Sequence, residues 1–148
     1  MTIIAKAEIN VPLPPGEAFE AFVNFPMWKF WMPPTCRPLN GPDRPLEAGD
    51  QFAVAVTAST GRVFKFYPKV LSIDPGREIR WGGGPKSILH AAHSIAFEPD
   101  SGDGTCVVST EPWIGLLTKI GFIGRFIDRE STLIMQAQLK GFRGSIVG

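Results

Sequence analysis

The sequence of 148 residues predicts an α+β fold: a curved antiparallel sheet of about seven strands wrapped round a long C-terminal helix, with two short helices after the first strand. Three observations lead to this expectation. Apolar residues recur at helical spacing near the C-terminus. The middle of the chain alternates apolar and polar residues in short runs between turn residues. Helical segments stand at both ends of this series of strands, an order typical of an antiparallel sheet packed on a helix.

The chain opens with a strand, because apolar and polar residues alternate over 3–11 and would leave one face in water. A run of prolines ends this strand, and Pro15 suits the first position of a helix over 15–23. Residues 24–31 are expected to form a second short helix or a turn that carries two tryptophans and two phenylalanines. Most of these rings are expected to fill the gap between short helices and sheet, with Trp31 facing a ligand cavity.

Six further strands follow, separated by turns rich in glycine, proline and aspartate. They are expected at residues 35–39, 52–56, 63–73, 77–81, 87–98 and 104–113. Pro68 interrupts the third of these runs and is expected at a bulge or a sheet edge, because proline has no backbone N–H to donate. The loop at 82–85 is not a phosphate cradle, since no Lys-Ser or Lys-Thr pair and no helix start follow it.

The C-terminal helix is expected from Ile114 to about Arg143, with one buried apolar stripe. The stripe consists of Leu116, Ile120, Ile123, Ile127 and Ile134. The opposite face consists of Thr118, Arg125, Arg129, Thr132, Gln136, Lys140 and Arg143. The buried stripe also carries Gly124, Ser131 and Gln138, with Glu130 on its flank. This inward polarity favours a helix that covers a roomy, partly polar cavity. Alternatively, backbone groups or buried water satisfy Ser131 and Gln138.

The last two strands are expected to place a polar pair on the inner wall of the sheet. If their loop centres near Gly102, residues whose numbers sum to about 204 face one another. His93 then lies beside Glu111 on the face that Ile95 and Phe97 mark as buried. Burying a lone carboxylate is costly, so a hydrogen-bonded or ionic pair is expected. The pair has two interpretations: groups that bind a ligand or move a proton, or a structural cross-strand pair.

Composition excludes several classes of function. A net charge of +1 and a pI of about 7.8 give no electrostatic footprint for nucleic acid or an anionic membrane, and no apolar stretch approaches a transmembrane span. No metal-binding, nucleotide-binding or nucleophile motif is found, so no metal and no cofactor are expected. For Cys36 and Cys106, free thiols are expected in preference to the alternative of a disulfide between them. Lys6 and Glu8 interrupt any signal-peptide segment, so a single cytoplasmic domain over 1–148 is expected.

Four segments occur in a fixed order along the chain. They are the opening strand with Pro14-Pro15-Gly16-Glu17-Ala18-Phe19, the turn Phe25-Pro26-Met27-Trp28, the strand Asp74-Pro75-Gly76-Arg77-Glu78-Ile79-Arg80-Trp81, and the hairpin with His93-Ser94-Ile95-Ala96-Phe97-Glu98-Pro99, Gly104-Thr105 and Glu111-Pro112-Trp113-Ile114-Gly115. In this order they resemble the SRPBCC or START-like superfamily, which includes polyketide cyclases/dehydrases and birch-pollen-allergen-like proteins. The resemblance implies a helix-grip fold with a deep hydrophobic cavity between sheet and helix. Trp113 and Ile95 stand where the family pattern commonly has phenylalanine, which would change the shape of that cavity.

Three functions are therefore considered. The first is binding of a small hydrophobic ligand, such as a lipid, a polyketide-like compound or an aromatic metabolite, inside the cavity. The residues expected to contact it are Trp31, Phe52, Val54, Phe64, Phe66, Trp81, His93, Ile95, Glu111, Trp113, Ile120, Ile127, Ser131 and Ile134. The second is a cyclase or dehydratase that uses His93 and Glu111 as acid and base. The third is a homodimer or partner interface formed by Phe122, Phe126 and Leu133.

Overall fold

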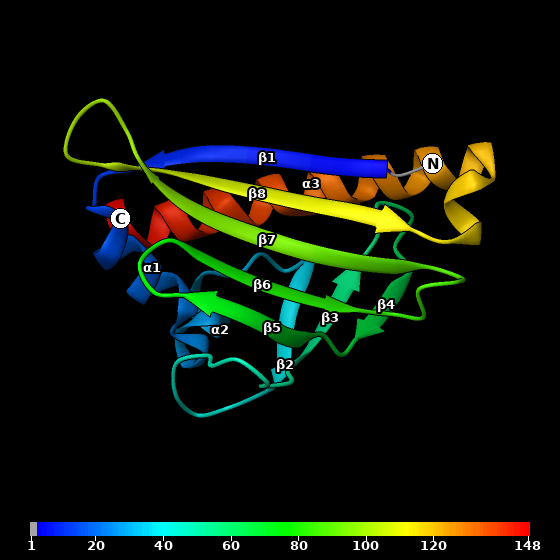
Figure 1. The fold of residues 1–148 in the computed structure, drawn as a ribbon, viewed down its shortest axis with the longest axis horizontal. Helices are drawn as coiled ribbons and strands as arrows, with labels where there is room; N and C mark the ends of the chain where they lie inside the picture. Colours follow the sequence, from blue (N-terminus) through cyan, green and yellow to red (C-terminus); the bar gives the residue numbers. More distant parts are fainter. Residues whose placement is uncertain (1–2) are drawn as a thin grey trace.

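The computed structural model describes residues 3–148 and shows two antiparallel sheets with a long C-terminal helix, α3 (Gly121–Val147) (Figure 1). The larger sheet has the order β1 (Ile3–Val11), β8 (Thr105–Ile114), β7 (His90–Pro99), β6 (Glu78–Gly83), β5 (Lys69–Asp74). The smaller sheet has the order β2 (Cys36–Asn40), β3 (Ala53–Thr57), β4 (Val63–Phe66). The predicted α+β fold is confirmed. Met1 and Thr2, the first residues of the expected domain, lie outside the described part.

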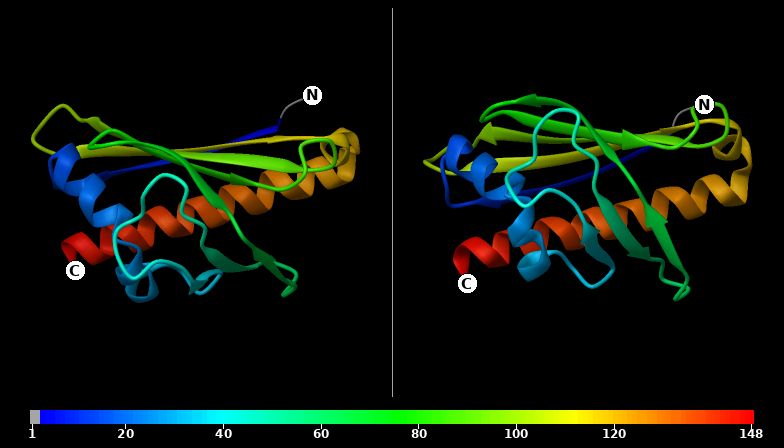
Figure 2. Two further views of the ribbon diagram at one scale, coloured as in Figure 1. Left: turned by 60° about the horizontal axis from the view of Figure 1, so that its bottom comes forward. Right: turned by 90° about the horizontal axis from the view of Figure 1, so that it is seen from below.

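The chain passes from the smaller sheet to the larger one at Pro68. The predicted third run, 63–73, forms two strands, because β4 pairs with β3 whereas β5 pairs with β6. Proline cannot donate to a ladder, so the chain can change its partner strand at this point. Figure 2 shows α3 running along the larger sheet, with the smaller sheet on its other flank. The two sheets therefore lie on two different sides of α3.

Short helices follow β1 as predicted: α1 (Pro15–Val23), the 3₁₀ turn η1 (Phe25–Met27) and α2 (Trp28–Trp31). Pro15 occupies the start of α1, where its missing N–H costs nothing. At the other end, the Phe22 carbonyl would bond to the N–H of residue 26, but residue 26 is a proline. The buried indole of Trp28 donates to this carbonyl instead, at 2.7 Å. A side chain thus ends α1 and fixes the aromatic segment that follows.

The predicted start of the C-terminal helix at Ile114 is wrong. Strand β8 extends to that residue, Gly115 then adopts a φ of +119°, and the 3₁₀ turn η2 (Leu116–Lys119) precedes α3, which runs on to Val147 rather than ending near Arg143. Because η2 breaks the helical phase, Leu116 and Ile120 are 62% and 38% exposed instead of buried. Thr118, predicted on the polar face, is buried.

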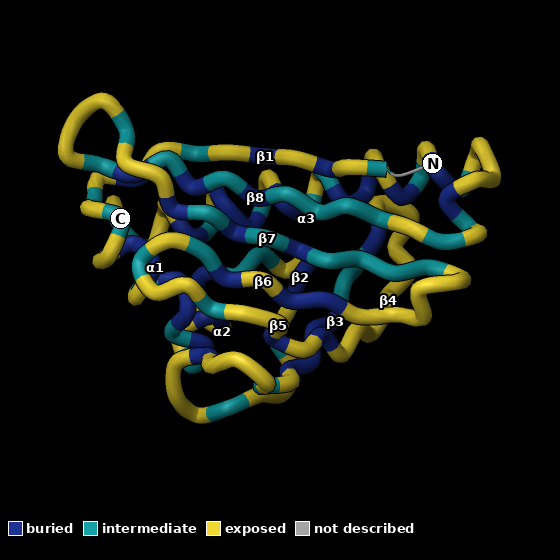
Figure 3. Tube along the Cα trace, in the orientation of Figure 1, coloured by how far each residue is buried: buried dark blue, intermediate teal, exposed yellow. Residues whose placement is uncertain are grey.

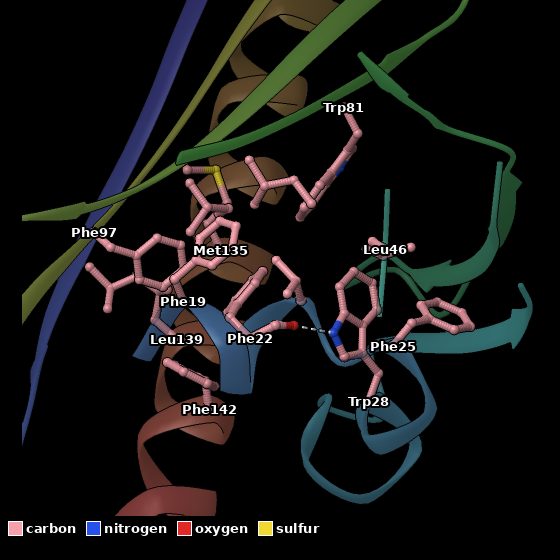
Figure 4. Packing of buried hydrophobic residues seen from close by; sticks show 14 of the residues in the cluster. Phe19, Phe22, Phe25, Trp28, Leu46, Trp81, Phe97, Met135, Leu139 and Phe142 are labelled. Atoms are coloured by element: carbon pink, nitrogen blue, oxygen red, sulfur yellow. Dashed lines mark hydrogen bonds between the residues drawn. The ribbon is translucent and has the colours of Figure 1, made fainter. Parts of the chain in front are cut away.

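An aromatic cluster fills the space between α3, α1 and the sheet. The ring of Phe22 lies at its centre, as Figure 4 shows. Its centroid is 5.1–6.3 Å from those of Trp28, Trp31, Trp81, Phe97 and Phe142. Met135, Leu139 and Phe142 bring the C-terminal half of α3 into this core. Each aromatic pair contributes roughly 0.5–1.5 kcal/mol beyond the burial of its area. The predicted filling role of the rings in residues 24–31 is confirmed for Phe25 and Trp28 but is wrong for Phe30, which is 71% exposed.

The exposed residues are concentrated away from this core. Strand β4 is exposed along its whole length (Figure 3).

None of the helices within residues 3–148 combines the length and the apolarity that crossing a bilayer needs.

The approach of α3 to α2 depends on Gly141. A Cβ atom at this position would overlap the carbonyl oxygen of Trp31, whereas a Cβ at Gly144, one turn later, would meet nothing within 4 Å. Gly141→Ala is therefore expected to lower the free energy of unfolding by about 1–3 kcal/mol through overpacking. Gly144→Ala is expected to raise it by up to about 1 kcal/mol, because alanine is the better helix former.

Urea unfolding of the two variants measures this difference. Stabilisation by both substitutions would show that α3 and α2 do not approach each other closely.

Candidate functional site

The predicted pairing of the last two strands is confirmed. Phe97 lies opposite Val107 and Ala91 opposite Trp113, the register expected from a loop centred near Gly102. On the inner face between these pairs, Nδ1 of His93 lies 3.4 Å from Oε2 of Glu111. The sequence pattern thus placed this polar pair correctly, while its role stays a prediction.

His93 is a neutral imidazole. It is 4% exposed, its Nε2 lies 2.6 Å from Oγ of Ser109, and its ring lies edge-on to Trp81 with centroids 4.8 Å apart. Burial lowers the pKa of His93 to about 3. Ser109 was missed at the sequence level, although it precedes Glu111 by two residues and therefore shares its face of β8.

Glu111 holds its proton unusually well. Burial raises the pKa of Glu111 to about 7, and this rise is partly offset by the side chains of Trp113 and Ser131. The indole N–H of Trp113 lies near the carboxyl, yet it makes no hydrogen bond of good geometry with any residue of 3–148. The contact between His93 and Glu111 therefore joins a neutral ring to a carboxyl that is about half protonated near pH 7. A protonated Glu111 can donate to Nδ1 while Nε2–H donates to Ser109.

The inward polar residues of α3 have partners from the sheets. Ser131 lies toward Glu111, and Gln138 donates to Sγ of Cys36 at 3.1 Å. Of the two interpretations of Ser131 and Gln138, the structure supports the one in which their hydrogen-bonding groups are satisfied within the protein. The partners are side chains, not the expected backbone groups or buried water. Cys36 and Cys106 are free thiols, as expected. Burial raises the pKa of Cys36 to about 11, so this thiol is a poor nucleophile.

The turn between β3 and β4 is attached to α3 by Glu130. Oε1 of this buried side chain accepts hydrogen bonds from the backbone N–H and the hydroxyl of Ser59, at 2.6 and 2.7 Å. The Ser59 hydroxyl is the main reason that the pKa of Glu130 is lowered. No pattern in the sequence pointed to this contact, because Ser59 and Glu130 are distant along the chain.

Two open hollows of the surface lie away from the expected cavity. They measure about 690 Å³ and about 600 Å³ and lie on the outside of α3 and beside α1. Neither lies between sheet and helix, where the aromatic cluster and the polar contacts of α3 meet. Within residues 3–148, His, Cys, Asp and Glu side chains nowhere gather in threes as a metal site needs.

The residues expected to contact a ligand fall into three groups. Five lie in the packed core: Trp31, Phe52, Val54, Trp81 and Ile95. A polar cluster consists of His93, Glu111, Trp113 and Ser131. The apolar remainder lies on β4 and α3: Phe64, Phe66, Ile127 and Ile134, with Ile120 on an exposed turn outside the predicted stripe. The structure thus brings the polar group together and leaves Ile120 apart from it. Contact of any of these residues with a ligand stays a prediction.

The raised pKa of Glu111 predicts a pH-dependent effect of Glu111→Gln. The wild-type protein keeps this proton when folded but loses it at about pH 4.5 when unfolded, so its stability falls as the pH rises from 4.5 through about 7. The glutamine side chain does not titrate, so the variant does not lose stability in this way. Its stability relative to wild type should therefore increase across that window by up to about 3 kcal/mol.

Urea unfolding at several pH values between 4 and about 8.5 measures the change. The depressed pKa of His93 acts in the opposite sense, because stability from this residue is lost as the pH falls below 6.5. His93 occurs in both proteins, so the comparison isolates Glu111. Ser131→Ala is expected to extend the upper end of this window to higher pH, because the Ser131 side chain lowers the pKa of Glu111 in the folded protein. A difference that does not vary with pH would show that the Glu111 carboxyl is solvated.

Solved structures share the fold of this chain at low sequence identity. The protein TTHA0849 from Thermus thermophilus superposes with a TM-score of 0.79 at 17% identity, covering 97% of each chain. The di-domain ARO/CYC StfQ from the steffimycin biosynthetic pathway gives 0.75 at 13% identity, covering 99% of this chain and 51% of StfQ. Ara h 8.0201 gives 0.65 at 16% identity, covering 99% of each chain. At these identities the likeness shows the fold alone.

A search among curated proteins finds no match. Residues 2–144 match the family described as "Polyketide cyclase / dehydrase and lipid transport", which confirms the resemblance found in the sequence motifs. The chain belongs to the polyketide cyclase/dehydrase and lipid transport family.

Proposed function

We propose that this protein binds a small hydrophobic molecule carrying one hydrogen-bonding group, between α3 and the inner wall formed by β7 and β8. The observation that supports this most directly is the buried N–H of Trp113, which makes no hydrogen bond of good geometry within residues 3–148, although it interacts with the neighbouring Glu111 carboxyl. An unpaired buried donor costs on the order of 1–3 kcal/mol. A carbonyl or hydroxyl oxygen of a ligand can accept from it and remove that cost.

Apolar side chains of the smaller sheet would supply further contact area. Phe64 and Phe66 face the same side of the smaller sheet as Val54 and Val56, which pack on the core. They are nevertheless 36% and 40% exposed. A hydrophobic ligand that covers them gains about 25 cal/mol for each Å² of apolar surface removed from water.

Access requires the turn between β3 and β4 to move away from α3. This movement breaks the two hydrogen bonds between Ser59 and Glu130 and leaves the hydrogen bonds within each sheet intact. The family description includes both cyclisation and lipid transport. Binding of a hydrophobic molecule is common to both activities.

Neighbouring residues of α3 allow a matched test of the location. Ile134 is half-buried against the core, whereas Leu133 is 49% exposed. Ile134→Trp should fill the proposed space and weaken binding of the fluorescent probe N-phenylnaphthylamine at least about tenfold, since overpacking of such a site costs about 1–3 kcal/mol. Leu133→Trp adds the same volume outside that space and should leave the affinity unchanged.

Fluorescence titration measures both affinities, and thermal unfolding checks that both variants fold. Equal affinity in the two variants would place the probe elsewhere. Native mass spectrometry of the protein purified from its host would identify the class of any ligand that accompanies it.

A second function, cyclisation or dehydration of a polyketide-like substrate, is favoured by one observation. A carboxyl with a pKa of about 7 is matched to proton transfer at neutral pH, and Glu111 has such a group next to a buried imidazole. In a dehydration, the Glu111 carboxylate would take the proton from the carbon next to the substrate carbonyl and return it to the departing hydroxyl, so that water leaves as the double bond forms. His93 is a weak base, because its pKa is about 3. Its plainer role is to orient Glu111.

His93→Gln separates binding from catalysis, because glutamine keeps hydrogen-bonding capacity without the imidazole. If the protein is a cyclase or dehydratase, the variant should bind a ketide thioester normally and turn it over at least about a hundredfold more slowly. Binding is measured by titration and turnover by chromatography of the products. Unchanged turnover, or no turnover by the wild-type protein, would contradict the enzymatic function and leave ligand binding untouched.

A further inference from the structure

One end of the molecule exposes large apolar side chains on two segments that are joined to each other. The turn η2 and the loop at 84–89 meet there, since the Leu116 N–H donates to the Ser87 carbonyl and the Leu117 N–H to the Ile88 carbonyl, at 3.0 and 3.1 Å. Leu116 is 62% and Ile88 52% exposed. The beginning of α3 lies at the same end of the long axis (Figure 1). Exposed apolar groups gathered in this way mark interaction surfaces.

The first turns of α3 continue this surface. Phe122 is 71% exposed, and Phe126 and Leu133 follow it four and eleven residues later, so all three share one side of the helix. Arg125 and Arg129 flank them. Together with Phe122 and Phe126, these arginines line the shallow hollow of about 690 Å³ on the outside of α3.

Charge is strongly one-sided at this end. The exposed cations Lys86, Lys119, Arg125 and Arg129 lie on the loop at 84–89, η2 and the first turns of α3. Asp128 is the exposed acid among these segments, and the Glu130 carboxylate is occupied by Ser59. Acidic residues gather instead in the β7–β8 turn, at the opposite end of the molecule: Glu98, Asp100 and Asp103. The net charge of +1, which suggested no anionic partner, hides this separation.

We propose that this end of the protein docks on the surface of an anionic lipid bilayer. Phe122 and Leu116 would enter the headgroup region, while Lys119, Arg125 and Arg129 contact lipid phosphates. Aromatic and aliphatic side chains flanked by arginines and lysines are the pattern of helices that lie in such an interface. A second copy of the chain fits less well, because a two-fold interface through this face would place the arginines of one copy against those of the other.

Vesicle co-sedimentation of the full chain tests the proposal, with phosphatidylcholine vesicles compared with mixed phosphatidylcholine and phosphatidylglycerol vesicles. The protein should bind the mixed vesicles selectively, and added salt should weaken binding. Arg125→Gln with Arg129→Gln should weaken it roughly 25-fold, about fivefold for each charge. Phe122→Ser should weaken it at least about tenfold. Phe30→Ser is the matched control: Phe30 is also 71% exposed and has a cation beside it, Lys29 Nζ at 5.2 Å from the ring centroid, but it lies on α2.

Three outcomes would overturn the proposal: no binding to either vesicle, equal binding to both, or equal effects of Phe122→Ser and Phe30→Ser. Light scattering provides a further check. A dimer that Phe122→Ser dissociates, without vesicle binding, would assign the surface to a second copy of the chain. Thermal unfolding verifies that these exposed substitutions leave the fold intact. The measurement needs no ligand, so its result is independent of the proposed binding function.

Discussion

The structure depends above all on the burial of one face of α3 against the aromatic cluster around Phe22. Met135, Leu139 and Phe142 anchor the C-terminal half of the helix in this cluster, and Gly141 allows the closest approach to α2. Because a helix is a stiff rod, fixing one half directs the other. The first turns of α3 therefore lie along the larger sheet and away from the aromatic core, at the end of the molecule that η2 and the loop at 84–89 form.

Polar contacts then determine how the first half of α3 is held. Glu130 accepts hydrogen bonds from Ser59 of the β3–β4 turn, and the side chain of Ser131 interacts with Glu111 of β8. Buried polar groups are tolerated only where partners satisfy them, so these contacts specify one orientation of the helix over the sheets. The Trp113 N–H is the exception. This buried donor lacks a well-formed hydrogen bond and lies next to Glu111 and His93, the titratable groups of the sheet whose pKa values are shifted most. Unsatisfied polar groups and shifted pKa values are often found at functional sites.

The two ends of the molecule therefore differ in character. Rings fill the space near α1 and α2 and leave little room for a ligand, whereas near β4 and the first turns of α3 apolar side chains remain exposed. The polar cluster around Glu111, the β3–β4 turn and the basic apolar surface of η2 and α3 are features of that less tightly filled side. Family membership fixes the fold, while the chemistry follows from these particular residues.

Local sequence determined the strands, the position of α1 and the presence of a long amphipathic helix. Alternation with a period of two, combined with one turn, was also enough to place His93 beside Glu111. These features were predictable because periodicity and turn chemistry act over a few residues. Pro68 was expected at a bulge or a sheet edge, but the division of one predicted run between two sheets was not expected.

Tertiary structure decided the rest. The exposure of Leu116 and Ile120 could not be predicted, because the turn at Gly115 resets the helical phase before α3 begins. The partners of Glu130 and Gln138 come from Ser59 and Cys36, far away along the chain. How completely the space under the sheet is filled, and how far burial shifts a pKa, depend on atoms that only the folded chain brings together, so no local pattern records them.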